Sequence, residues 1–236
     1  MSRSVLGVVL LGLVGLASVG DAQDADQAKQ QFAQAQKENA AALRHYTWKS
    51  RTELKMKGES KSVKVDQVRY DLDGKTQKTA ISASPAPEEP QSSGRRGRRG
   101  GGRAKAKLIE NKKEEFAELM KNLGQLVASY LHLPPDKAQA FAHNATTGVT
   151  EDGAILIQSV NVLHEGDTMA VQIDPASYMM RRIEIHTSLE NKAVHFTGEF
   201  RPVTEGPTYP ARLTLQYPDK EVELTIENYD YQKLGM

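Results

Sequence analysis

An alternation of apolar and polar residues between Ala154 and Tyr231 is the feature that most constrains the fold of this chain. The alternating segments are short, and residues typical of turns, such as Glu205-Gly206-Pro207, separate them. Because successive side chains of a strand point to opposite sides of a sheet, each segment predicts a strand with one apolar face and one polar face. The run therefore predicts an antiparallel meander that is buried on one side and solvated on the other.

The apolar positions change from odd to even numbers at Asn191-Lys192, which offers a test of this meander. A two-residue loop at this point pairs Leu189 with Val194 and Ile183 with Phe200. In this register the apolar residues of both strands stay on one side of the sheet. The same argument pairs the next two strands through their leucines, and the sequence predicts a sheet with a continuous apolar face.

An earlier block of strands precedes this meander. Residues 46–56 alternate clearly, and Asp73-Gly74 is a typical hairpin turn, with a return strand over residues 75–81. Between them the alternation changes phase from Val65 to Val68, which predicts a bulge at this point. These strands supply a second part of the predicted sheet.

Helical composition and periodicity occur in three segments. Residues 26–44 are rich in Ala, Gln and Lys, residues 108–131 carry a broad apolar stripe, and a shorter helix is expected from Pro135 to Phe141. The 108–131 helix has the stripe that best matches an exposed apolar sheet, and the first helix is a weaker candidate. The predicted fold class is therefore α+β: a curved antiparallel sheet, or incomplete β-barrel, with helices packed in its concave face.

The first residues predict the compartment. Arg3 precedes an uncharged apolar run over residues 5–19, and small residues around Ala22 suit cleavage by a signal peptidase. A membrane anchor is the alternative, but the run is shorter than the roughly 20 residues that span a bilayer. We expect residues 1–22 to be a signal peptide of a periplasmic or secreted protein, and residues 23–236 to form one domain. The chain has no cysteine, so disulfides and a lipidated cysteine are excluded.

A Pro-, Gly- and Arg-rich segment at residues 83–107 cannot bury a core and predicts a disordered insert. Its arginines are Arg95, Arg96, Arg98, Arg99 and Arg103. Three interpretations remain open: a solvated linker, a contact with an anionic lipid surface, and nucleic-acid binding. Outside the cytoplasm we expect lipid headgroups and not nucleic acid as the polyanion.

A further pattern is the stretch Val171-Gln172-Ile173-Asp174-Pro175 followed by Met180-Arg181-Arg182-Ile183-Glu184-Ile185. With a strand that begins Tyr46-Thr47-Trp48 and a helical insert between the strands, it resembles the LolA/LolB-like superfamily of lipoprotein-sorting carriers. The resemblance covers most of the expected mature domain, although the arginine-glycine segment departs from it. It implies an incomplete barrel with a helical lid over an apolar cavity that holds lipid or acyl chains.

Candidate ligand-binding residues follow from the predicted sheet face and the helix that covers it. The expected cavity wall and lid consist of Trp48, Leu54, Met56, Met120, Leu123, Val127 and Tyr130. Each of these residues could instead belong to a closed core, since buried aromatic and aliphatic side chains most often do. The sequence leaves this alternative open.

Catalytic and metal-binding patterns are missing from the sequence. It contains no nucleophile-elbow serine and no Gly-rich phosphate loop, so an enzyme is not expected, nor a cofactor. His186 and His195 are predicted to share the polar face of adjacent strands. A metal site would need further ligands, and the residues expected nearby, among them Glu184, Glu199 and Arg182, indicate a solvated face of mixed charge, so no metal site is predicted.

Three functional hypotheses remain. The first is a periplasmic carrier or binding protein for a lipid, acyl chain or lipoprotein, acting as a monomer and without catalysis. The second is a structural or interaction domain of the cell envelope with a filled core, whose basic loop contacts anionic lipid surfaces. An outer-membrane barrel is the third, and it is disfavoured because only 6% of residues are aromatic and helices interrupt the strands.

Overall fold

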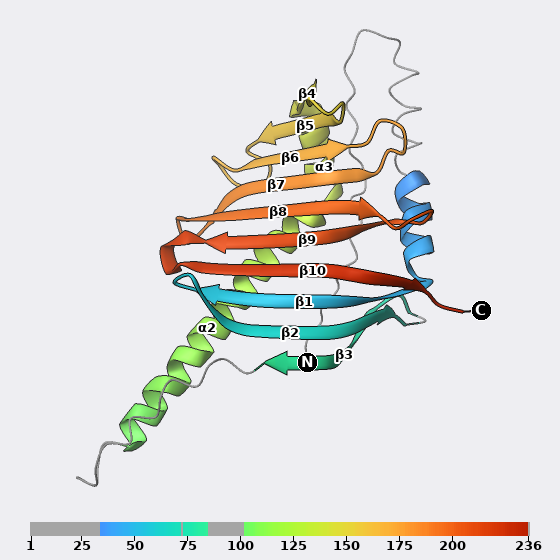
Figure 1. The fold of residues 1–236 in the computed structure, drawn as a ribbon. Helices are drawn as coiled ribbons and strands as arrows, with labels where there is room; N and C mark the ends of the chain where they lie inside the picture. Colours follow the sequence, from blue (N-terminus) through green and yellow to red (C-terminus); the bar gives the residue numbers. More distant parts are fainter. Residues whose placement is uncertain (1–33, 72, 85–101, 236) are drawn as a thin grey trace.

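A single antiparallel sheet dominates the computed structural model, which describes residues 34–71, 73–84 and 102–235, with backbone alone for residues 102–113. The strand order is β3-β2-β1-β10-β9-β8-β7-β6-β5-β4, so the sheet is open, with β3 and β4 at its edges (Figure 1). The strands are β1 (Tyr46–Met56), β2 (Glu59–Tyr70), β3 (Thr76–Ser84), β4 (Thr146–Val149), β5 (Ile155–Val160), β6 (Thr168–Ile173), β7 (Met180–Leu189), β8 (Lys192–Pro202), β9 (Thr208–Tyr217) and β10 (Val222–Lys233).

The two predicted blocks of strands meet in the middle of the sheet. β1 begins the first block, β10 ends the second, and the two pair along almost their whole length, from Tyr46 opposite Lys233 to Met56 opposite Val222. This pairing joins the two blocks of strands into one layer. The predicted α+β class with a large antiparallel sheet is confirmed.

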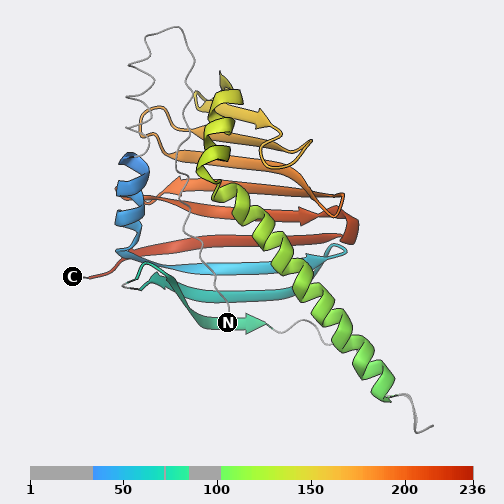
Figure 2. The same ribbon diagram turned by 180° about the vertical axis from the view of Figure 1, so that it is seen from behind.

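Helices lie on one side of this sheet. α2 (Gly102–Leu131) crosses the sheet diagonally and extends past β3, as Figure 2 shows, and α3 (Pro135–Asn144) follows it on the same side. A helix over residues 34–43 is tied to the start of β9, since the Asn39 side chain exchanges two hydrogen bonds with the backbone of Thr208, at 2.6 and 2.8 Å. A short 3₁₀ helix, η1 (Pro218–Lys220), links β9 to β10.

We call the side of the sheet that α2 covers the α2 face. One cross-strand row of this face consists of Leu54, Leu224, Leu215, Phe196, Ile185 and Met169, on β1, β10, β9, β8, β7 and β6. Ile185 and Met169 are fully buried, and Phe196 and Leu215 are each 6% exposed. Burial of each such side chain contributes about 1.5–3 kcal/mol, so this face forms the core.

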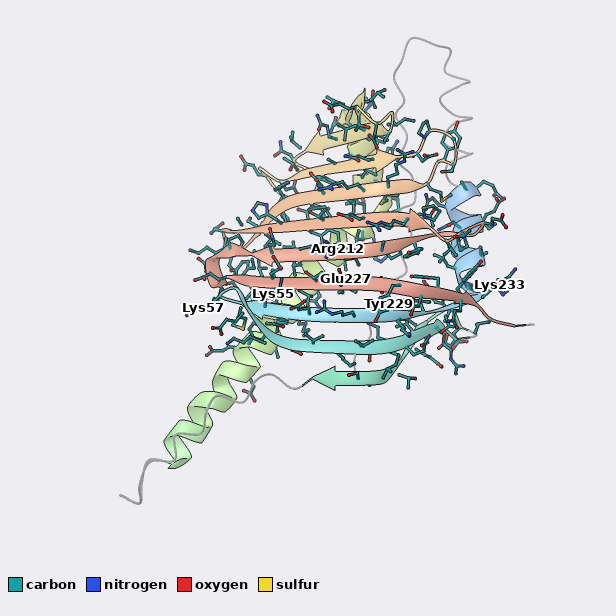
Figure 3. All side chains as sticks on the ribbon, in the orientation of Figure 1. Lys55, Lys57, Arg212, Glu227, Tyr229 and Lys233 are labelled. Atoms are coloured by element: carbon teal, nitrogen blue, oxygen red, sulfur yellow. The ribbon has the colours of Figure 1, made fainter. Side chains whose placement is uncertain are left out.

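The opposite side, which we call the polar face, carries charges. Its central row consists of Arg51, Glu227, Arg212, Glu199 and Arg182, on β1, β10, β9, β8 and β7. Positive and negative side chains alternate along it, and Glu227 accepts from Arg212 at 2.6 Å and from Arg51 at 3.4 Å. Arg212 and Glu227 lie on this exposed side in Figure 3. The predicted division into one apolar and one polar face is therefore present across the sheet.

The predicted register of the β7–β8 hairpin is wrong by two residues. Val194 lies opposite Thr187, and Ile183 lies opposite Gly198. The loop is Glu190-Asn191, with φ of 53° and 62°, as a two-residue type I′ turn requires. A two-residue shift keeps every side chain on its side of the sheet, which explains why the faces were predicted correctly.

The bulge predicted between Val65 and Val68 is also misplaced. β2 runs without interruption against β1 in this region, and the extra residue is Ile81 on β3. A bulge is less costly on an edge strand such as β3, which has one neighbour in the described sheet. The change of phase in β2 instead moves Val68 onto the α2 face together with the acidic residue Asp66.

Both ends of the segment predicted as an insert, residues 83–107, belong to regular elements. β3 continues to Ser84, and α2 begins at Gly102 and not near Leu108, because the helical composition extends further toward the N-terminus than the apolar stripe does. The intervening residues 85–101, which carry Arg95, Arg96, Arg98 and Arg99, lie outside the described residues, as does the expected signal peptide. Within the described part of the chain, no helix is long and apolar enough to cross a membrane.

Candidate functional site

An apolar crevice lies between α2 and the middle of the sheet, and we call it the α2 crevice. Its volume is about 160 Å³. Its lining consists of Gly124, Val127, Ala128, Leu131 and His132 on the helical side and Phe196, Leu213, Leu215, Leu224 and Ile226 on the sheet. Nine of these ten residues carry no polar side chain, so the crevice suits a hydrocarbon and offers little to a polar ligand.

Small residues of α2 create this space. Gly124 and Ala128 are four residues apart and therefore lie on the same side of the helix, next to Val127. A Cβ atom on Gly124 would meet no other atom within 4 Å. The side chains of the sheet below line this space but do not fill it, so the volume that the two small residues leave free remains open.

A smaller pocket of about 60 Å³ continues the α2 crevice toward β2, and Leu213 and Ile226 line both. The indole of Trp48 stacks on the Tyr231 ring at 5.3 Å with an angle of 1° between the planes, and Tyr70 lies 5.3 Å from the indole on another side. Burial raises the pKa of Tyr70 and of Tyr231, so both hydroxyls stay protonated and uncharged. We call this the aromatic pocket.

Polar groups enter the α2 face near the aromatic pocket. Ser50 is 4% exposed, and Asp66, directly opposite on β2, is 3% exposed. The Nζ of Lys64 lies 2.9 Å from Oδ1 of Asp66, but no donor among the described residues meets this oxygen with hydrogen-bond geometry. The nearby ammonium group of Lys64 compensates the charge of Asp66 without a hydrogen bond to this oxygen, and this lowers the cost of burying the carboxylate.

The C-terminal end of α2 is fixed to the sheet by a buried hydrogen-bond network. The Tyr130 hydroxyl donates to Oδ2 of Asp167 at 2.5 Å and lies 2.7 Å from the Thr187 hydroxyl. Asp167 precedes β6 and also accepts from the backbone N–H groups of Val162 and Leu163, at 2.5 and 2.9 Å, and from that of His164. This network fixes the last turns of α2 to the loop between β5 and β6.

The protonation states of this network follow from its surroundings. Burial, and then the hydrogen bond to Asp167, raise the pKa of Tyr130, which therefore remains a donor. Burial opposes ionisation of Asp167, but the hydrogen bonds from Tyr130 and the three backbone N–H groups outweigh it and lower the pKa of Asp167. The network is thus a protonated phenol that donates to a carboxylate.

The seven residues predicted as cavity wall or lid lie in different places. Val127 lines the α2 crevice, and Trp48 lines the aromatic pocket. Leu123 and Tyr130 are fully buried in the core, with Leu54, Met56 and Met120 partly buried around it. Each residue therefore lies on the predicted side of its element, but two of the seven border the open space.

Several lining residues were missed from the sequence. Gly124 and Ala128 are small, and two small residues within an apolar helix stripe are the sequence signal of a gap beside the helix. Leu213 and Tyr231 join the site because β9 and β10 lie beside β1, which the sequence does not reveal. Arg103 lies in the first turn of α2, and its side chain is outside the described residues.

No protein-family model matches this chain, and no curated protein matches it. Two solved structures are similar. One is a LolA superfamily protein from Nitrosomonas europaea, with 10% identity, a TM-score of 0.36, and coverage of 89% of this chain and 94% of that one. The other is a DUF1329 family protein from Desulfovibrio piger, with 9% identity, a TM-score of 0.44, and coverage of 87% and 92%.

Both TM-scores are below 0.5 and both identities are about 10% or lower, so neither similarity carries an argument about the function of this chain. Function is therefore inferred from the α2 crevice and the residues that line it. The described residues contain no group of three or more His, Cys, Asp or Glu side chains that could hold a metal ion.

Proposed function

We propose that this protein is a non-enzymatic carrier or binding protein for an apolar ligand, namely a lipid, an acyl chain or the acyl chains of a lipoprotein. The observation that carries the proposal is the α2 crevice, an apolar space that runs beneath a helix and continues into the aromatic pocket. The crevice is partly open, with Gly124 exposed at its border, so its apolar lining would contact water if nothing bound there. An acyl chain between α2 and the sheet covers this lining.

The size of the crevice specifies how a ligand enters. Pockets that bury drug-sized ligands measure about 300–1,000 Å³, and the α2 crevice, at about 160 Å³, is smaller. It therefore holds a short segment of hydrocarbon as it stands. A longer chain requires α2 to move away from the sheet.

Contacts along α2 support a movement of its N-terminal part. The network around Tyr130 fixes its C-terminal end. Toward the N-terminus, Phe116, Leu119 and Met120 are only partly buried. Since partly buried apolar contacts are less costly to break than a buried hydrogen-bond network, we infer that α2 pivots about Tyr130. The flexible side chain of Met120 is suited to this repacking.

The proposed compartment is the periplasm, reached by cleavage of the signal peptide near Ala22, and the proposed state is a monomer. The apolar run over residues 5–19 supports the first proposal. The arginine-rich residues 95–103 are joined to the end of α2 that extends past the sheet. Contact of these arginines with an anionic lipid surface would bring the covering helix close to its ligand source.

Lipid retained by the protein from its own host tests the proposal. Ala128→Leu fills the α2 crevice from the helix, whereas Ala117→Leu adds the same atoms at an exposed position of α2. We expect native mass spectrometry and solvent extraction to find bound lipid in the unchanged protein and in Ala117→Leu. Ala128→Leu should retain at least about tenfold less, because a filled space cannot accept a chain. Equal lipid in both variants, or none in any protein, would contradict the proposal.

The alternative is an envelope domain with a permanently filled core. It is favoured by Leu123 and Tyr130, which have no exposed surface and hold their part of α2 closed. Under this alternative the α2 crevice is a packing defect. Ala128→Leu then raises the melting temperature by filling it, and no lipid is extracted from the unchanged protein.

A further inference from the structure

His186 and His195 are brought together on the polar face by the geometry of the β7–β8 hairpin. The pair Leu189–Lys192 closes the two-residue loop, and His186 lies opposite His195 three pairs further along. Pairs in an antiparallel ladder alternate between hydrogen-bonded and non-hydrogen-bonded, and the pair that closes a two-residue loop is hydrogen-bonded. The histidines therefore form a non-hydrogen-bonded pair, in which opposing side chains approach most closely.

The two imidazoles meet through the same type of nitrogen. Nδ1 of His186 lies 2.6 Å from Nδ1 of His195, and the ring centroids are 4.7 Å apart with the planes at 82°. One nitrogen must donate to the other at this distance, so a proton occupies the space between two nitrogen lone pairs. His186 is exposed and His195 is partly buried, so both rings can be reached from solvent.

A metal ion can take the place of this proton when the donating neutral imidazole changes to its Nε2–H tautomer, because both Nδ1 atoms then present lone pairs to the ion. Metal–imidazole bonds of about 2.0–2.1 Å place two nitrogens about 2.9 Å apart at a right angle and about 3.4 Å apart at a tetrahedral angle. The Nδ1 atoms need to separate by a few tenths of an ångström for the first geometry and by more for the second. Square-planar ions such as Cu²⁺ therefore fit better than tetrahedral Zn²⁺, and Cu²⁺ also binds imidazole more strongly.

The neighbours of the pair in the same row do not repel such an ion. The positions beside it in the same cross-strand row are Thr168 on β6 and Gln216 on β9, which are uncharged. The Gln216 amide donates to Glu223 at 3.2 Å and so points along the row toward β10. Neither neighbour places a positive charge directly beside the two nitrogens.

We propose that His186 and His195 form a two-nitrogen site on the polar face for a divalent transition-metal ion, with Cu²⁺ preferred, whose remaining coordination positions are open to water or to a further ligand. Two adjacent strands fix both histidines, so the site is pre-organised before the ion arrives. Among the described residues no third His, Cys, Asp or Glu side chain completes a metal-binding group with this pair, so the proposed site has two protein ligands. The site is independent of the α2 crevice, which lies on the other side of the sheet.

Titration of the purified protein with Cu²⁺ tests this site, by calorimetry and by electron paramagnetic resonance. We expect one equivalent to bind with the signature of two equatorial nitrogens, and Zn²⁺ to bind more weakly. His186→Gln and His195→Gln should each weaken binding by at least about tenfold, since one imidazole is lost. His143→Gln, an exposed histidine of α3, is the matched control and should bind as the unchanged protein does.

The change in melting temperature on adding Cu²⁺ separates a loss of metal binding from a loss of stability, because each variant is compared with itself without the ion. Saturating Cu²⁺ should raise the melting temperature of the unchanged protein and of His143→Gln, because the ion binds the folded hairpin, and should not raise that of His186→Gln. Affinity of His186→Gln within twofold of the unchanged protein would overturn the proposal. A spectrum with a single nitrogen ligand would also overturn it.

Discussion

The two faces of the sheet stabilise the same strands through different interactions, apolar burial on one face and contacts between charged side chains on the other. On the α2 face, burial of apolar side chains supplies the stability, and it tolerates a shift of two residues because every side chain stays on its side. On the polar face the same shift is unfavourable, because it brings like charges opposite each other. In the register predicted from the sequence, Arg182 would lie opposite Arg201 and Glu184 opposite Glu199; in the observed register Arg182 lies opposite Glu199. The comparison teaches that burial selects the face and charge selects the register.

The largest difference between the faces should appear when a carboxylate is placed on each. Leu215→Asp puts a charge into the core, where Leu215 is 6% exposed, and Thr214→Asp puts one next to it on the polar face. We expect Leu215→Asp to lower the free energy of unfolding by about 4 kcal/mol or more, or to prevent folding. Thr214→Asp should change it by less than about 1 kcal/mol. Urea denaturation measures both, and similar losses would show that the faces are not distinct.

A tyrosine from each side gives a smaller contrast. Tyr130→Phe removes the donor to buried Asp167 and should cost about 1–3 kcal/mol. Tyr229→Phe, on the polar face (Figure 3), should cost less than about 0.5 kcal/mol. The measurement is urea denaturation at neutral pH, and equal effects of the two variants would mean that the network does not hold α2.

The same variant has an expected pH dependence. The pKa of Asp167 is lowered in the folded state, so its contribution is present above its ordinary value of about 3.9 and is lost as the pH falls below it. Tyr130→Phe removes one cause of this lowering. Its stability should therefore fall less steeply below pH 4 than that of the unchanged protein, and an identical slope would show that Tyr130 does not stabilise the carboxylate.

The smallest expected effect concerns the charges that select the register. Glu199→Arg places three arginines in succession along the row, between Arg182 and Arg212. We expect a loss of about 1 kcal/mol at low salt, and recovery of most of it in 1 M NaCl, since exposed charges are screened. Glu165→Arg, in the loop before β6, makes the same charge change outside the row and should be nearly neutral. A loss that salt does not relieve would contradict a role of charge in the register.

The sequence predicted the faces of the strands because side-chain direction depends on the local backbone alone. Trp48 and Leu54 lie on the side that the alternation of residues 46–56 assigned to them, and the helix with the broad stripe packs into the core on that side, which Leu54 borders. The limits of the helices were less well predicted. α2 starts at Gly102 because polar helix formers extend a helix beyond the apolar residues that identify it.

The candidate site was predicted in part for the same reason. Val127 belongs to a periodic apolar stripe and could be predicted from it. Gly124 and Ala128 contribute to the crevice because they have no large side chain to fill it. Tyr130 was predicted as part of the cavity wall or lid, with a place in the core as the alternative. Its partner Asp167 comes from a distant loop and has no local signal. A hydrogen bond between distant segments follows from their packing and not from either segment.

The sequence by itself determined the strands, their apolar and polar sides, and the helix that covers one of them, because these depend on the periodicity of neighbouring residues. The tertiary structure alone decided that β1 lies beside β10, that the β7–β8 loop is Glu190-Asn191, and that a space remains beneath Gly124. It also decided that two histidines on one face meet at 2.6 Å. Such features depend on the summed packing of segments far apart in the chain, since a register or a gap is fixed only when all its neighbours are in place.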